Sequence, residues 1–157
     1  MVDRLTVDRR SVNMSRIRSR NTRPEMVVRR LLHAAGYRYR LQRKDLPGKP
    51  DLVFGPRRKV IFVHGCFWHQ HEDTTCLDGR RPKSNTGYWH QKLHRNVERD
   101  RQNEDALRAM GWDVMTVWEC ETEKTGAVGL LERLRRFLDT PGPKCHALPM
   151  RAASKPT

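Results

Sequence analysis

The 157-residue sequence contains no long hydrophobic segment. No apolar run approaches the roughly 18 residues needed to cross a bilayer, so we expect no membrane partner. The first residues carry charges with no apolar stretch behind them, and we expect no secretory signal. Cysteine is also scarce, with four residues in the chain. Without export, these thiols favour a metal site over disulfides, and the sequence predicts a cytoplasmic protein.

Acidic residues are few, with 18 Asp and Glu against 32 Lys and Arg, and the net charge is +14. An excess of this size and sign indicates the kind of partner rather than the fold, and nucleic acid is the usual polyanion. The alternative is a basic surface that only confers solubility. A hydrophobic fraction of 36% in a chain of this length suits one domain with a real core.

Composition divides the chain into three parts: a basic arm at 1–21, a domain at 22–140, and a loose tail at 141–157. In the arm, apolar Met14 lies among arginines that include Arg16 and Arg20. Such a segment suits gripping a phosphate backbone or pressing into a groove. A solvated arm is the alternative, and composition alone does not separate the two.

Hydrophobic patterning predicts alternating helices and strands. Thr22 to Glu25 has the form of a capping box with Pro24 early in the helix, and Gly36 is a natural C-cap. A turn at 55–58 joins two short apolar runs into a β-hairpin. The expected helices are 23–35, 88–110 and 128–138, and the expected strands are 37–41, 51–54, 59–63 and 112–118. The sequence therefore predicts an α/β fold in which helices flank a mixed sheet.

The expected helix at 88–110 carries two stripes. Asn96, Asp100 and Asn103 form a polar stripe by the i, i+4, i+7 rule. The expected apolar face consists of Trp89, Leu93, Val97, Ala106, Leu107 and Met110.

The stretch VIFVHGCFWHQHEDTTC at 60–76 concentrates the proton-transfer and metal-binding side chains. Asp51 begins one hairpin strand and His64 ends its antiparallel neighbour, so both lie near the same end of the sheet. A carboxylate suits Mg²⁺, and His64 and His69 have the right unperturbed pKa, about 6.5, for proton transfer. Asp100 could orient one imidazole. This is the layout of a metal-dependent nuclease core, whereas the alternative is surface histidines and acids paired with arginine.

Cys66, His71 and Cys76 follow one another at intervals that suit one metal ion, and Cys120 ends a strand that could pair nearby. Thiolates with an imidazole favour zinc, and a closed set of four would be structural. Free thiols near a histidine-rich loop are the alternative. Cys145 lies in the tail and is left out of this set.

Phe67 and Trp68 lie between the two candidate sites, and Trp89 begins the long helix. These aromatics could fill the core, or they could stack on bases, which contributes roughly 1–3 kcal/mol per base.

With these residues identified, the chain resembles the very-short-patch mismatch-repair endonucleases, bacterial relatives of type II restriction enzymes. The matching segments are NMSRIRSRNTRPE at 13–25, LPGKPDLVF at 46–54, VIFVHGCFWHQH at 60–71, NVERDRQN at 96–103, and GWDVMTVWEC at 111–120. The resemblance implies a restriction-endonuclease-like core with a structural zinc site. It also implies nicking of one DNA strand on the 5′ side of the thymine in T:G mismatches, which arise when 5-methylcytosine deaminates.

The resemblance also implies roles for individual residues. Asp51, with the backbone carbonyl of Val63, would bind catalytic Mg²⁺, and His69 would activate the attacking water. Asp100 would orient His69, His64 would contact the scissile phosphate, and Glu25 would assist. The structural zinc would be held by Cys66, His71, Cys76 and Cys120. The residues implied in DNA binding are the aromatic wedge of Phe67, Trp68 and Trp89 and the arm with Met14, Arg16 and Arg20.

Two positions depart from the family pattern. Val63 stands where the family usually has threonine, and the loop from His71 to Cys76 is longer than in members with a His-x-Cys spacing. The expected partners are double-stranded DNA with a T:G mismatch and mismatch-repair proteins, and a monomer suffices for a single nick. The competing hypothesis is a non-enzymatic, zinc-stabilised DNA-binding module, which gives no role to Asp51, His69 and Asp100. A ββα-metal nuclease would need its Asn and His at closer spacing.

Overall fold

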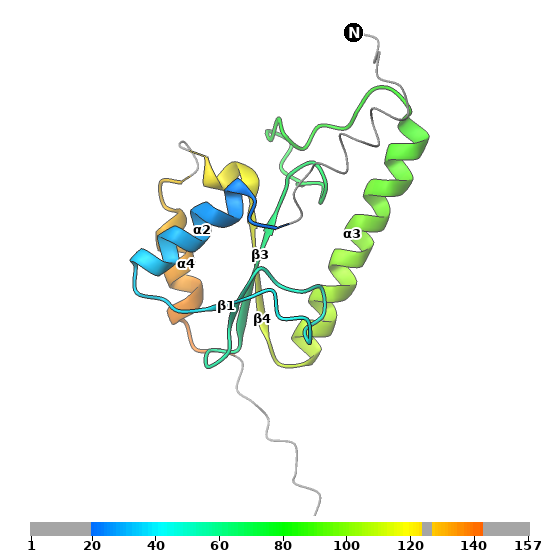
Figure 1. Ribbon diagram of the computed structural model, residues 1–157. Coiled ribbons are helices and arrows are strands. Elements are labelled where there is room, and N and C mark those ends of the chain that lie inside the picture. The colour runs from blue at the N-terminus through cyan, green and yellow to red at the C-terminus, as the bar shows by residue number, and fades with distance from the viewer. Residues whose placement is uncertain (1–19, 124–126, 143–157) are drawn as a thin grey trace, which may run out of the picture.

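The computed structural model describes residues 20–123 and 127–142. A four-stranded sheet with strand order β1-β2-β3-β4 forms its centre. Helices α2 and α4 lie on one side of the sheet and the long helix α3 on the other (Figure 1). The elements are α2 (Arg23–Ala34), β1 (Arg40–Leu41), β2 (Leu52–Phe54), β3 (Lys59–His64), α3 (Thr86–Ala109), β4 (Asp113–Trp118), the 3₁₀ turn η1 (Glu119–Thr122) and α4 (Leu130–Asp139). This arrangement confirms the predicted α/β fold with helices flanking a mixed sheet.

Strand β3 is the centre of the sheet. It pairs antiparallel with β2, where Leu52 faces Ile61, and parallel with β4, where His64 faces Trp118. All six residues of β3 are buried, because both of its faces are covered by helices. The predicted hairpin between β2 and β3 is therefore confirmed.

Successive residues of β3 contribute to different cores. Ile61 and Val63 belong to the cluster that also holds the buried leucines of α4 and Val28 and Leu32 of α2. Val60 and Phe62 belong to the cluster under α3. This alternation explains why a short strand is apolar at consecutive positions.

Helix α2 begins as predicted, with Thr22 accepting a hydrogen bond from the backbone N–H of Glu25 at 3.4 Å. The second half of the expected capping box is wrong. The Glu25 carboxylate accepts from the backbone N–H of Asn21 and from Arg29 rather than from the Thr22 backbone. Gly36 follows the helix with a φ of +93°, a conformation that favours glycine.

The strand expected at 37–41 is reduced to Arg40–Leu41. Its partner β2 is only three residues long. The Tyr37 hydroxyl instead donates to the carboxylate of Asp139, and the Tyr39 hydroxyl donates to the backbone carbonyl of Arg29. These bonds draw the residues before β1 toward α4 and α2.

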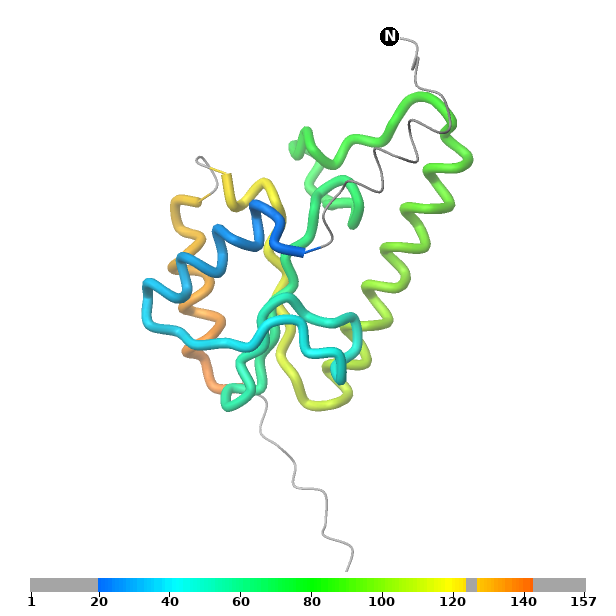
Figure 2. The backbone as a smooth tube through the Cα atoms, in the orientation of Figure 1, coloured from blue at the N-terminus to red at the C-terminus, as the bar shows by residue number. Residues whose placement is uncertain are grey.

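The apolar face expected on α3 is only partly correct. Leu93 and Leu107 are buried, but Val97 is 38% exposed and Met110 47% exposed. The helix extends well past the sheet, as the tube in Figure 2 shows, so much of its length has no sheet to pack against. The last helix begins at Leu130 rather than at Val128, which is 87% exposed. Among the helices within the described ranges, none is long and apolar enough to cross a bilayer.

Candidate active site

A pocket of about 920 Å³ lies where the start of α2, the loop before β2, the end of β3 and α3 meet. All five residues proposed from the sequence as catalytic line it: Glu25, Asp51, His64, His69 and Asp100. They come from four separate segments of the chain. The fold therefore brings together the side chains that the sequence predicted would converge.

Asp51 lies directly before β2, and the hairpin register fixes its carboxylate against β3. Its Oδ2 accepts a hydrogen bond of 2.7 Å from the backbone N–H of Val63. Burial raises the pKa of Asp51 to about 6, and the Val63 N–H, which favours the ionised form, opposes this only in part. A nearby cation would stabilise the ionised form of a buried carboxyl group with this pKa. Oxygen ligands from Asp51 and from the Val63 carbonyl fit the preference of Mg²⁺.

The two imidazoles of the pocket are stacked on each other. The rings of His64 and His69 are nearly parallel, with centroids 3.9 Å apart. Burial, with a smaller contribution from His69, lowers the pKa of His64 to about 3. In the protein without ligand this favours the neutral imidazole near pH 7, which can donate one hydrogen bond.

Helix α3 holds the loop that follows β3. Nδ1 of His69 is hydrogen-bonded to the carboxylate of Asp100. One turn earlier on the helix, Asn96 donates to the backbone carbonyl of Trp68 at 3.0 Å. The hydrogen bond at Nδ1 leaves Nε2 as the ring nitrogen of His69 that can act on a ligand.

A second cluster lies beside the pocket. Ligand atoms of Cys66, His71, Cys76 and Cys120 all lie within 4.8 Å of one another. Three thiols and one imidazole make a donor set that zinc prefers, and the spacing fits one tetrahedral ion. Burial raises the pKa of the Cys66 and Cys120 thiols, so a cation is needed to hold them as thiolates. The excluded Cys145 lies outside the described residues.

Parallel pairing of β3 with β4 explains how Cys120 reaches this cluster. His64 faces Trp118, so the residues after both strands emerge at the same edge of the sheet. The ring of His71 stacks on that of Trp118, with centroids 4.4 Å apart. The carboxyl ends of two neighbouring strands thus supply ligands to one site.

The predicted aromatic residues form one partly exposed cluster. Phe67 contacts Trp68 and Trp89 edge to face, with centroids 5.0 and 5.4 Å apart. The sequence did not identify two members of this cluster. Tyr88 packs edge to face on Trp89, and the ammonium of Lys92 lies 5.6 Å from the centroid of the Trp68 ring. Their spacing of four residues along a helix was the available signal. The exposure of this cluster favours stacking on a ligand over core filling.

Basic side chains line the same pocket. Of the three arm residues proposed to contact DNA, Arg20 is exposed and lines the pocket. Met14 and Arg16 lie outside the described residues. The pocket also receives basic residues that the sequence did not single out, namely Lys44, Lys49, Lys92 and Arg99.

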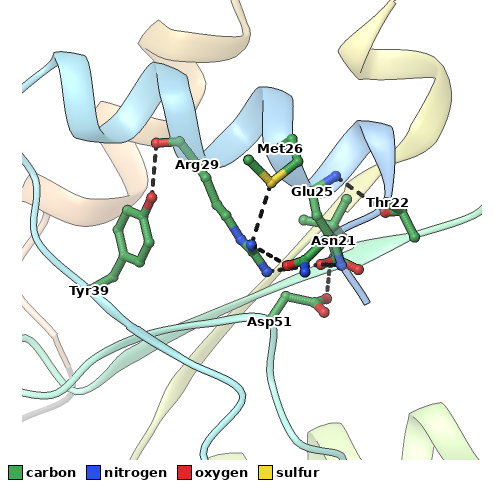
Figure 3. Close-up of polar contacts among 8 residues, drawn as sticks. Asn21, Thr22, Glu25, Met26, Arg29, Tyr39 and Asp51 are labelled. Carbon is green, nitrogen blue, oxygen red and sulfur yellow. Dashed lines mark hydrogen bonds and ion pairs between the residues drawn. The ribbon is translucent and has the colours of Figure 1, made fainter. Parts of the chain in front are cut away.

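Glu25 is 3% exposed and belongs to a hydrogen-bonded ring with Asn21 and Arg29 (Figure 3). Figure 3 also shows Asp51 next to this ring. The sequence identified Glu25 but gave no indication of Arg29, because the residue lies among several arginines on the same helix.

Known proteins share this sequence over most of its length. The family model for the DNA mismatch endonuclease Vsr matches residues 2–75. The chain is 55% identical to the type II nicking enzyme V.XorIIP of Xanthomonas oryzae pv. oryzae, covering 88% of this chain and 98% of that protein. It is 43% identical to the type II nicking enzyme V.NmeAIP of Neisseria meningitidis, covering 88% and 95% of the two chains. It is 42% identical to the DNA mismatch endonuclease Vsr of Escherichia coli, covering 82% and 83%. With this identity over nearly whole relatives, the chain belongs to the Vsr family of DNA mismatch endonucleases.

Proposed function

We propose that this protein nicks one strand of double-stranded DNA on the 5′ side of the thymine in a T:G mismatch, in a reaction that requires Mg²⁺. In the cell, such mismatches follow deamination of 5-methylcytosine, and the nick would begin a short-patch repair in the cytoplasm. The observation that carries this proposal is the convergence of Asp51, His64 and the His69–Asp100 pair in one pocket that basic side chains also line.

His69 is the proposed general base. Asp100 is hydrogen-bonded to Nδ1, so Nε2 is free to take the proton from the attacking water. Asp100 fixes this tautomer and favours the imidazolium that results. Its position on α3, a rigid helix, keeps the pair aligned.

Asp51 and the Val63 carbonyl are the proposed Mg²⁺ ligands. When bound there, Mg²⁺ supplies positive charge that offsets the charge developing on the phosphate. His64 is neutral and donates a hydrogen bond to a phosphate oxygen. The valine side chain at position 63 is compatible with this role, because only the backbone of that residue is used.

Cys66, His71, Cys76 and Cys120 would hold a structural Zn²⁺. All four positions have a protein ligand, so no coordination site remains open for substrate. The ion would link the loop after β3 to the start of η1. It would thereby fix the segment that carries His69.

Recognition of the mismatch is assigned to the aromatic cluster and the arm. Phe67, Trp68 and Trp89 would insert beside the mispaired step, which is easier to unstack than a paired one. The arm at 1–21 would approach the DNA from the groove opposite the aromatic cluster. The domain at 22–140 would act as a monomer, and the tail at 141–157 would take no part. The net charge of +14 supplies sequence-independent affinity that weakens with salt. Mismatch-repair proteins are the further partners that we propose.

A nicking assay tests the proposal. Duplexes with T:G, T:A or C:G at one position, each in several flanking sequences, are labelled on one strand at a time. Mg²⁺ is omitted and then restored, because a strong chelator would also extract zinc from thiolates. The expected result is a single nick 5′ of the mispaired thymine that requires Mg²⁺. Cleavage of paired DNA at the same rate would contradict the specificity, and tight binding without any nick would favour the zinc-stabilised binding module.

A further inference from the structure

Arg29 is the one arginine that the fold buries within the described part of the chain, with 8% of its surface exposed. Its neighbour Arg30 is exposed, as are most arginines along the described helices. Burial of a guanidinium group removes its hydration, which is unfavourable unless other groups replace the water.

Two oxygen acceptors and the sulfur of Met26, a weak acceptor 3.5 Å from Nη1, partly replace that water. Nη2 of Arg29 donates to Oε2 of Glu25 at 3.1 Å, and Nη1 donates to Oδ1 of Asn21 at 2.7 Å. The backbone N–H of Asn21 donates to the same Oε2 at 3.0 Å, which closes the ring of three residues. The planar guanidinium spans both partners, a geometry that an ammonium group cannot reproduce.

This ring is not well suited to stabilising the fold. Nε of Arg29 is buried and has no hydrogen-bond partner within the described residues. A buried ion pair of this kind is often no more stabilising than well-packed apolar side chains of the same volume. Its presence therefore points to a role in the site.

The ring meets the pocket through one member, Glu25, and Arg29 itself does not line it. Glu25 lines the pocket together with Asp51, and so do Arg20 and Thr22 on either side of Asn21. We propose that Arg29 is a positioning residue: by bridging Asn21 and Glu25, it holds the Glu25 carboxylate beside Asp51. This inference rests on the proposed nicking function, and it assigns to Arg29 no contact with DNA.

The experiment compares five variants with the wild-type protein: Arg29→Met, Arg29→Lys, Glu25→Gln, the double variant Glu25→Gln/Arg29→Met, and Arg30→Met as the matched control on the same helix. Nicking of the T:G duplex gives kcat and KM, and thermal unfolding gives Tm. The amide hydrogen exchange of Asn21 reports on the ring without any reaction.

Misplacement of a group beside the reacting atoms lowers rates by roughly 10–100-fold. We therefore expect Arg29→Met to lower kcat by about that factor with little change in KM, and Asn21 to exchange faster. Arg29→Lys recovers part of the loss, and Arg30→Met behaves as wild type. Because Arg29 acts through Glu25, the double variant is no slower than Glu25→Gln alone.

A folded Arg29→Met protein with wild-type kcat overturns the inference while leaving the proposed function intact. If Arg29→Met does not fold because Glu25 is left unpaired, the neutral double variant decides. A double variant slower than Glu25→Gln by tenfold or more would likewise overturn it. Failure of the wild-type protein to nick any duplex would instead overturn the proposed function itself.

Discussion

Replacement of Asp100 by asparagine tests the proposed acid–base pair most directly. The carboxylate accepts a hydrogen bond from Nδ1–H of His69 and leaves Nε2 free to take a proton. An asparagine in the same place can donate its amide N–H to Nδ1, which favours the tautomer with the proton on Nε2. In that tautomer His69 cannot accept a proton from water at the reacting side.

The size of the effect follows from the burial of the pair. The side chains of His69 and Asp100 are 23% and 18% exposed, so solvent screens their interaction only partly. General-base catalysis contributes about 10²–10⁴-fold. At about 1.36 kcal/mol per factor of ten, kcat should fall by an amount equivalent to roughly 3–5 kcal/mol in activation free energy.

Single-turnover nicking of a T:G duplex at saturating Mg²⁺ measures this rate, and fluorescence anisotropy measures DNA affinity. Asp105→Asn is the matched control, since this exposed residue lies on the same helix and the substitution makes the same change in charge. We expect Asp100→Asn to bind DNA as wild type does and Asp105→Asn to nick at the wild-type rate. A loss in Asp100→Asn of less than about fivefold, well below the range for a general base, would refute the role of His69 as base.

Three further predictions concern other parts of the site. Asp51→Asn should abolish nicking yet stabilise the metal-free protein. The pKa of Asp51 is about 6 in the folded protein and 3.8 in the free side chain. The ionised carboxylate therefore disfavours folding increasingly as the pH rises from about 4 to 6. Chemical denaturation should show a gain on the order of 2–3 kcal/mol at pH 7 and none at pH 3.5, and an equal gain at both would contradict this linkage. Trp68→Ala should reduce the preference for T:G over T:A duplexes by an amount equivalent to about 1–3 kcal/mol, whereas an unchanged preference would place Trp68 in a packing role. Removal of zinc, or Cys66→Ser, should lower Tm and nicking together while Cys145→Ser changes neither, and a Cys66→Ser protein with wild-type Tm would contradict a structural zinc.

The sequence predicted well the end of the sheet where Asp51 and His64 lie, because the patterns that determine it are local in the sequence. The turn at 55–58 and the apolar runs around it determine the hairpin, and the hairpin register brings Asp51 to the backbone of Val63, next to His64 in the chain. The order of strands in the sheet is consistent with the restriction-endonuclease-like core that the family resemblance implied. Local patterns were thus sufficient wherever the contacts are between neighbours in the chain.

Prediction failed where a contact depends on how far an element extends in space. Val97 matches the apolar pattern of α3, but the sheet is too short to cover the whole helix, whereas Met110 lies just past the last helical residue, Ala109. Arg29 resembles its exposed neighbours in sequence, and only the packing of α2 against the pocket distinguishes it. Periodicity identifies a face of a helix but not the partner that covers it.

The segment from His64 to His71 supplies two clusters in turn. His64 and His69 face the pocket, while Cys66 and His71 belong to the thiol cluster. Backbone bonds from the N–H of His69 to Gly65 and from the N–H of His71 to Cys66 fix the path between them. An insertion or deletion of a single residue here would shift both clusters at once. The mostly exposed stretches at 72–75 and 77–85 hold none of these ligands, and a change of length there would leave the spacing from His64 to His71 intact.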